Sequence, residues 1–219
     1  MYVTKIERMS LNWKGCEEMA LIKLFSGMDF SGKSTTVKNL SIAMPGKFKC
    51  QQKFITPIKT LQEMIDNNIW VPRKDFIPML QEMVLTDVRD YYQKDIILQD
   101  TLWVIKFTAK LLAEGKIIYE TEIKKFLSLI KNYPDMDSFY VTASMEKRKD
   151  RYQKRLLNGE RISCSDRLLF SGNRFEEIEK YYKEIIFSRF PDTKIIDTTN
   201  QSPFQIVEIL KNDTSIKGN

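Results

Sequence analysis

Residues 27–34 combine two glycines, a lysine and a hydroxyl side chain in an order suited to binding a chain of phosphates. Gly27 is followed by four residues and then by Gly32, Lys33 and Ser34, which is the P-loop pattern. The glycines let backbone N–H groups turn toward an anion, and the start of a following helix adds partial positive charge. In this pattern the lysine reaches the β and γ phosphates and the hydroxyl binds Mg²⁺. We therefore expect ATP and Mg²⁺ as cofactors.

The segments on either side of this loop have the secondary structure that the motif requires. The short apolar run 20–27 is typical of a buried strand, and residues 34–44 continue as a helix that ends near Pro45 and Gly46. A strand, a glycine-containing loop and a helix follow one another, so we expect the whole loop to contact the nucleotide. The residues assigned to ATP binding are Gly27, Phe30, Ser31, Gly32, Lys33, Ser34 and Thr35. We expect Lys33 to face solvent in the empty site.

Asp100 is the acidic residue best suited to act with this loop. It ends the compact apolar run 95–100, which is typical of a buried parallel strand. Together with Ser34 it is a candidate ligand of Mg²⁺, an ion that prefers oxygen ligands. A hydrolytic ATPase usually has a second acid at this point to polarise water, but Thr101 follows Asp100. The pattern therefore favours phosphoryl transfer to a second substrate over hydrolysis.

A strongly basic helix is expected over residues 145–159, directly after the apolar strand 137–144. Arg151 and Arg155 are four residues apart and so lie on one side of that helix. A lid over about 145–172 would use such residues to neutralise the charge of the transferred group and to exclude water. The alternative is a solvated basic helix face. The basic residues of this helix are Lys147, Arg148, Lys149, Arg151, Lys154 and Arg155.

The whole chain alternates between apolar strands and amphipathic helices. This alternation predicts an α/β fold of the P-loop NTPase type, in which helices cover both faces of a parallel β-sheet and a basic lid closes over it. We expect a polar extension over 1–18 and a single domain over 19–219. The apolar face of helix 101–115 suits a core or a subunit contact, and we expect a homodimer. Besides those already given, the predicted strands are 47–56 and 193–199, and the predicted helices are 60–68, 73–94, 174–190 and 203–210.

Composition excludes several other kinds of protein. The chain of 219 residues has no histidine, which removes serine–histidine catalysis and histidine-based zinc sites, and its three cysteines lack metal-ligand spacing. Acids are interspersed with the bases that give the formal charge of +6, so a phosphate-rich small molecule explains the excess without a nucleic-acid partner. No apolar run reaches the length of a membrane span. We expect a cytoplasmic protein with no membrane partner.

Roughly residues 20–212 resemble the thymidylate kinase-like and deoxynucleoside kinase-like P-loop kinases. The resemblance rests on the loop SGMDFSGKSTT, the helix segment LTDVRD, the strand IILQD, the strand and lid helix SFYVTASMEKRKDRYQKR, and the final strand and helix IIDTTNQSPFQIVEIL near the adenine pocket. It implies that Asp29 approaches the sugar hydroxyl of the acceptor and that Arg89 binds the acceptor nucleotide. It also implies that Asp100 is the catalytic aspartate. The residues assigned to catalysis are Lys33, Asp100, Arg151, Arg155 and Asp29.

Two departures from that family fall on the acceptor side. The family usually has an arginine directly after the strand aspartate, where it contacts the acceptor phosphate, and this chain has Thr101. The basic segment that is closest in sequence as a substitute holds Arg73 and Lys74. The family also has an Arg-Glu-Pro-Gly-Gly-Thr run after its second strand, of which FITPIKTLQ keeps a proline and a threonine. The residues assigned to acceptor binding are Asp29, Arg89, Arg73 and Thr101.

Three functions follow from these observations. The leading one is ATP-dependent phosphoryl transfer to a nucleoside monophosphate, as in thymidylate kinases. A kinase of the same fold that acts on a nucleoside or another small hydroxyl compound is the alternative, and Thr101 favours it because an acceptor phosphate would lack a partner there. A non-catalytic module that binds nucleotide to regulate a partner is the third. The presence of Lys33, Ser34 and Asp100 together argues against it.

Overall fold

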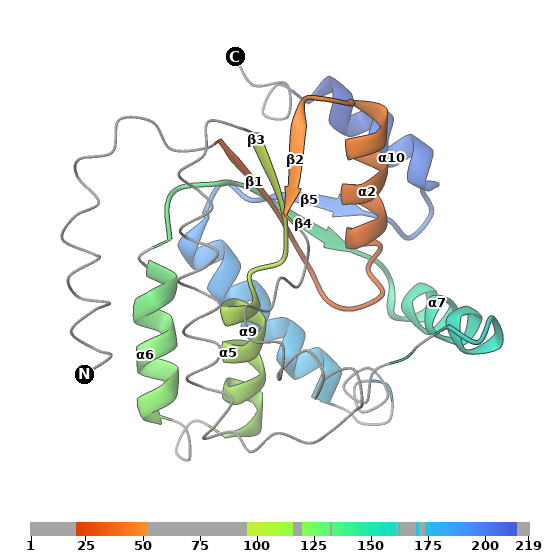
Figure 1. The fold of residues 1–219 in the computed structure, drawn as a ribbon. Helices are drawn as coiled ribbons and strands as arrows, with labels where there is room; N and C mark the ends of the chain where they lie inside the picture. Colours follow the sequence, from red (N-terminus) through yellow and green to blue (C-terminus); the bar gives the residue numbers. More distant parts are fainter. Residues whose placement is uncertain are drawn as a thin grey trace.

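The computed structural model describes residues 21–51, 96–115, 120–131, 133–160, 162, 170 and 174–213. These residues form strands and helices that alternate along the chain, and Figure 1 shows their arrangement. In chain order the elements are β1 (Ile22–Ser26), α2 (Lys33–Ala43), β2 (Phe48–Gln51), β3 (Ile96–Asp100), α5 (Trp103–Glu114), α6 (Glu120–Lys131), β4 (Asp137–Thr142), α7 (Met145–Leu157), α9 (Arg174–Arg189), β5 (Lys194–Asp197) and α10 (Pro203–Asn212).

The strands form one five-stranded sheet in the order β2-β3-β1-β4-β5, and all neighbouring strands are parallel. Leu24 of the central strand lies opposite Gln99 of β3 and Ser138 of β4. From β1 the chain moves to one side of the sheet for β2 and β3, and then to the other side for β4 and β5. In open α/β sheets ligands bind at the carboxyl ends of the strands beside such a reversal.

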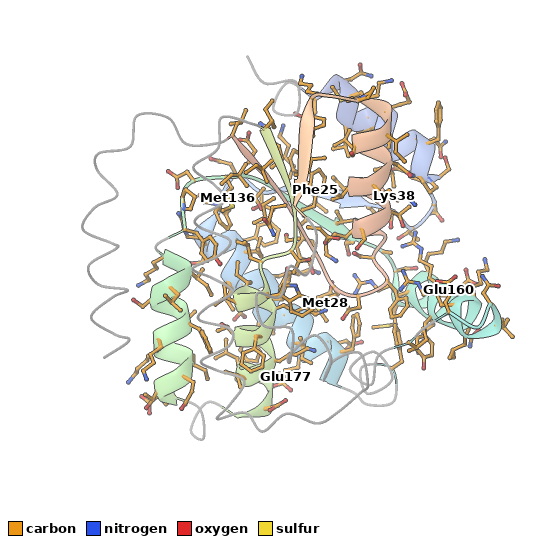
Figure 2. The ribbon with its side chains drawn as sticks, viewed as in Figure 1. Phe25, Met28, Lys38, Met136, Glu160 and Glu177 are labelled. Atoms are coloured by element: carbon orange, nitrogen blue, oxygen red, sulfur yellow. The ribbon has the colours of Figure 1, made fainter. Side chains whose placement is uncertain are left out.

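Two layers of helices cover the two faces of the sheet. Figure 1 shows α5, α6 and α9 on one face and α2 with α10 on the other, which confirms the predicted arrangement. Successive strand residues point to opposite faces, so Leu24 joins the core under α5 and α9 while Phe25 joins the core under α2 and α10. Figure 2 shows Met28 in the loop after β1, and its side chain belongs to the first core.

Local sequence signals explain where the helices near the carboxyl edge begin. Ser202 caps α10 in a capping box with Gln205, and Pro203 occupies the start of that helix. Ser144 caps α7 by accepting a hydrogen bond from the Lys147 N–H at 3.2 Å. These caps define the first turns of both helices and therefore the direction in which each leaves the sheet.

The helix α6 is an element that the sequence analysis did not predict. Ile123, Phe126 and Ile130 are its buried residues, and their spacing of three and four residues is the signal that would have identified it. The apolar face of α5 packs against α9 and α6.

Within the described ranges, no helix has the length and apolar character needed to cross a membrane. The helices predicted at 60–68 and 73–94 lie outside the described residues.

We predict that Gly27→Ala will destabilise the fold by about 3 kcal/mol or more. The φ of Gly27 is 141°, and a Cβ there would lie 2.2 Å from the Val141 carbonyl oxygen. Gly46→Ala is the matched control, because its φ of 75° is also positive but nothing lies within 4 Å of its Cβ position. It should cost about 1–2 kcal/mol. Urea unfolding of the two variants measures the difference, and equal losses would show that the close approach to Val141 is not what requires glycine.

Candidate active site

The loop between β1 and α2 has an open anion-binding geometry. Gly27, Phe30 and Gly32 have φ values of 141°, 61° and 94°, so the backbone reverses direction repeatedly within the loop. Gly32 is the N-cap of α2 and contributes no side-chain cap, and the first turn of the helix contains no acidic residue. No side chain therefore caps the N–H groups at this helix end, and the helix dipole favours an anion there.

Lys33 and Asp100 meet at this loop because β1 and β3 are neighbours. Phe25 lies in register with Asp100, so the ends of both strands lie together. The Lys33 Nζ lies 3.5 Å from the Asp100 Oδ1, and both side chains are buried. The expectation that Lys33 faces solvent was wrong: it is 4% exposed. The parallel pairing of β1 with β3 encloses its ammonium beside the carboxylate, which partly offsets the cost of burying the charge.

Asp29 forms a second buried ion pair, with Lys106 of α5. The Lys106 Nζ donates hydrogen bonds of 2.6 and 2.7 Å to the two carboxylate oxygens of Asp29. The same ammonium lies 5.0 Å from the centroid of the Trp103 ring. The sequence analysis assigned Asp29 to the site but missed Lys106. A lysine among buried neighbours such as Ile105 and Ala109 on an apolar helix was the available signal.

Thr101 has an unusual backbone conformation at the end of β3. Its φ is 70°, a region that β-branched residues rarely occupy, and its side chain is buried. The Thr101 N–H donates to the Phe25 carbonyl at 2.9 Å, and its hydroxyl donates to the Asp100 Oδ1 at 3.2 Å. Position 101 therefore orients Asp100 and joins β3 to the end of β1.

A pocket of about 230 Å³ lies beside the loop, between the lid helix α7 and the start of α10. Five residues assigned to ATP binding or catalysis line it, which brings the loop and the lid together. The sequence analysis did not assign its remaining residues to the site, although Lys154 was among the basic residues of the lid helix. The lining residues are Phe30, Gly32, Thr35, Thr36, Arg151, Lys154, Arg155, Thr198, Gln201, Pro203 and Ile206.

Arg151 connects α7 to the loop. Its Nη1 donates to the Phe30 carbonyl at 2.9 Å and to the Thr198 Oγ1 at 3.0 Å, and its Nη2 donates to the Thr198 carbonyl at 3.0 Å. Burial, together with repulsion from the nearby Arg148, lowers the pKa of the Arg151 guanidinium below its ordinary value. A nearby anion would relieve this unfavourable environment.

Thr198 holds the lid side of the loop in place, and the sequence analysis missed it. Its hydroxyl donates to the Ser31 carbonyl at 2.6 Å and lies 3.0 Å from the Thr142 carbonyl. Its own N–H donates to the same Thr142 carbonyl at 2.9 Å. Thr198 follows β5 and Thr142 ends β4. The Thr198 side chain therefore connects the ends of these two strands to the P-loop. Nothing in the local sequence indicates such contacts.

Arg155 faces the same pocket from the next turn of α7. Its guanidinium lies 5.0 Å from the centroid of the Phe30 ring, in a cation–π arrangement, and its Nε lies 3.7 Å from the Glu160 carboxylate. The Phe30 ring also contacts the rings of Tyr152 and Phe170. Arg151 and Arg155 thus share one side of α7, as predicted, and that side faces the loop. Figure 2 shows Glu160, the ion-pair partner of Arg155, near α7.

Arg148 has a different role from the basic residues with which the sequence analysis grouped it. It is buried, and it donates hydrogen bonds of 3.1 and 2.9 Å to both carboxylate oxygens of Glu179 in α9. Burial acts to raise the pKa of Glu179, but the hydrogen bonds and charge of Arg148 lower it overall. Arg148 thus attaches α7 to α9 and is not a cation of the site.

The remaining assigned residues divide into three groups. Ser34 and Thr35 are exposed in the first turn of α2, whereas the Ser31 hydroxyl is buried and has no hydrogen-bond partner among the described residues. Arg89 and Arg73 lie outside those residues.

The part of the chain that the structure describes contains no cluster of three acidic, histidine or cysteine side chains that would hold a metal by itself.

Comparison with known proteins supports the fold. No protein-family model and no curated protein sequence matches the chain. Among solved structures, a thymidylate kinase from Candida albicans is 19% identical, with a TM-score of 0.66 over 90% of this chain and 94% of the other. A deoxyadenosine kinase from M. mycoides is 18% identical, with a TM-score of 0.60 over 88% and 97%. A thymidylate kinase from Ehrlichia chaffeensis is 14% identical, with a TM-score of 0.52 over 89% and 98%. The chain therefore has the P-loop NTPase fold of these kinases.

We predict that Arg148→Ala will destabilise the protein by about 2 kcal/mol or more, because it removes two charged hydrogen bonds from Glu179 and leaves that carboxylate with the Tyr140 hydroxyl and the half-exposed Lys183. Lys149→Ala is the matched control on the exposed face of the same helix and should change stability by less than about 0.5 kcal/mol. Because the folded-state pKa of Glu179 is lowered, the ion pair stabilises fully above the ordinary pKa of glutamate, and this stabilisation is lost as the pH falls through the folded-state value. Thermal unfolding between pH 3 and 7 measures both effects. A loss in Arg148→Ala that does not shrink toward low pH would contradict this account.

Proposed function

We propose that this protein is a kinase that transfers the γ-phosphoryl group of ATP to a nucleoside monophosphate in the presence of Mg²⁺. The observation that carries the proposal is the position of the Lys33–Asp100 pair beside the open helix end of the P-loop. A basic pocket adjoins the loop on its lid side. Phosphoryl transfer needs positioned charge more than covalent chemistry, and this arrangement supplies it.

The donor nucleotide would bind across the loop and the adjoining pocket. The backbone N–H groups from Gly27 to Lys33 would hold the phosphates, and the adenosine would lie between Arg151 and the start of α10 at Pro203. The mixed polar and apolar lining of the pocket supports a nucleoside there. The unfavourable burial of the Arg151 guanidinium supports an anion beside it.

Two residues would hold Mg²⁺ together with the nucleotide phosphates. The Ser34 hydroxyl is exposed in the first turn of α2, and the Asp100 carboxylate lies at the end of the neighbouring strand. This small oxygen donor set fits Mg²⁺, which keeps several waters and binds proteins through one or two carboxylates plus substrate phosphates. When bound, the ion would neutralise charge on the transferred group and on the leaving ADP.

The two carboxylates of the site support a phosphate acceptor over a hydroxyl acceptor. The named activities of the similar structures include both, because thymidylate carries a phosphate and deoxyadenosine does not. A hydroxyl must lose a proton as it attacks, but Asp29 and Asp100 each face a lysine ammonium. A phosphate monoester is largely dianionic at neutral pH and needs no base. Its oxygen would attack the γ phosphorus, the bond to the β-phosphate oxygen would break, and ADP would leave with that electron pair.

A nucleoside acceptor is the second candidate, and Thr101 is the observation that favours it. The Thr101 side chain is directed at Asp100, so position 101 offers no cation to an acceptor phosphate. If a hydroxyl is the nucleophile, Asp29 or Asp100 would have to accept its proton while remaining beside a lysine.

Coupled ADP-release assays with ATP, Mg²⁺ and a panel of nucleosides and their monophosphates test the proposal. We expect stimulation by at least one monophosphate, and Lys33→Met should lower kcat by about 100-fold or more because the transferred charge loses its cation. Lys38→Met is the control, since Lys38 lies further along α2 on its exposed face (Figure 2). ADP release that no member of the panel stimulates would refute a nucleoside or nucleotide kinase, and stimulation by nucleosides alone would select the second candidate.

The lid arginines provide a separate prediction. Arg151→Ala and Arg155→Ala should each lower kcat by about 100-fold if they stabilise charge that develops during transfer. The loss of ATP affinity should be smaller than the loss of kcat, although both residues line the donor pocket. Arg151 should have the larger effect, because its contacts also hold Phe30 and Thr198. Lys149→Ala provides the control on the opposite, exposed side of α7. Steady-state kinetics and ATP titrations separate the parameters, and unchanged kcat in both arginine variants would leave a solvated helix face as the explanation.

A further inference from the structure

Lys106 is a buried cation that the proposed donor site does not use. It is 5% exposed, and its ion-pair partner Asp29 is 8% exposed. Burying both charges has a desolvation cost, and a well-packed apolar pair at such positions is often equally stable or more stable. The fold of α5 therefore does not require a lysine there, because buried apolar residues such as Ile105 and Ala109 already hold the helix against its neighbours.

The position of Lys106 in the sheet topology assigns it to the acceptor side of the loop. The pocket with Arg151 and Arg155 lies on the side of β1 where β4 and β5 are found. Lys106 comes from α5, which follows β3 on the opposite side of β1. A phosphoryl acceptor has to approach the γ-phosphate from the side away from the rest of the nucleotide. With the donor nucleotide bound as proposed, Lys106 would lie on that side.

The donor capacity of Lys106 is not exhausted by Asp29. An ammonium has three N–H groups, and two hydrogen bonds to Asp29 are present. Its side chain is flexible, so its charge can shift from the carboxylate to a ligand. Thr101 does not compete for this role, since its hydroxyl is directed at Asp100.

We infer that Lys106 is the residue that selects an anionic acceptor, by binding its phosphate group, and that Asp29 is the counter-ion of Lys106 until that phosphate arrives. This inference rests on the proposed function and specifies its acceptor side. In this role Lys106 contributes charge and position and forms no covalent bond. Lys106 would thereby supply the charge that the family's arginine supplies at the position of Thr101.

The test is equilibrium binding without ATP, so that it does not depend on turnover. Thymidine and deoxyadenosine monophosphates, each compared with its own nucleoside, are titrated by calorimetry into the wild type and Lys106→Met. We expect at least one monophosphate to bind the wild type and Lys106→Met to weaken it about 30-fold or more, the size of a lost charged hydrogen bond. Binding of the nucleosides and of ATP should change less than about threefold. Lys125→Met, at an exposed position of the neighbouring helix α6, is the control and should match the wild type.

Two further variants separate a ligand-binding lysine from one that merely neutralises Asp29. Asp29→Asn should leave Lys106 available and tighten monophosphate binding several-fold. The double variant Asp29→Asn with Lys106→Met has no buried charge at the pair and should fold, but it should bind monophosphate as weakly as Lys106→Met. Recovery of binding in the double variant would overturn the inference, as would a wild type that binds no monophosphate. Turnover is measured separately. If the wild type binds a monophosphate but does not phosphorylate it, the proposed kinase activity is refuted and this inference is not. If Lys106→Met turns over with the KM of the wild type for the monophosphate, this inference is refuted and the kinase activity is not.

Discussion

The approach of the P-loop backbone to the end of β4 is the constraint on which the rest of the site depends. At Gly27 the chain passes so close to the Val141 carbonyl that a methyl group would overlap it, at 2.2 Å. The loop can therefore turn under the neighbouring strand and start α2 with its N–H groups directed outward. From that position, the loop brings Asp29 to α5 and Lys33 to β3. A loop displaced by the width of a side chain would lose both contacts.

Charge in the site is balanced by pairs contributed from different elements. The loop supplies Asp29 and Lys33, while α5 and β3 supply their partners Lys106 and Asp100. In a buried environment a charge without a partner is far more costly than a pair, so each pair restricts where its two elements can lie. In the proposed function, a phosphate or a metal ion that enters the site would exchange with one partner of a pair.

The helix α7 combines an anchor and a basic surface within three residues. Arg148 fastens the helix to Glu179 of α9, and Arg151 turns toward the loop and Thr198. Their spacing of three residues is nearly one helical turn, so the contact of Arg148 with α9 places Arg151 directly beside the loop. The first turns of this basic helix are therefore packed against α9, although most of its charged side chains are exposed. The composition of the helix does not distinguish the arginine that anchors it from the arginine that contacts the loop.

The sequence by itself determined the elements and the nature of the loop. Strand and helix periods, the Gly-x-x-x-x-Gly-Lys-Ser spacing and the acid after the apolar run 95–100 are local signals, and they identified the P-loop and most of the sheet. The helix α6 carried such a signal and was overlooked. The burial of Lys33, the contacts of Thr198 and the pairing of Asp29 with Lys106 were decided by the tertiary structure. These contacts join residues 67 to 167 positions apart, or depend on two strands becoming neighbours. Local chemistry shows which residues can bind a phosphate, but only the order of strands in the sheet determines which charges meet.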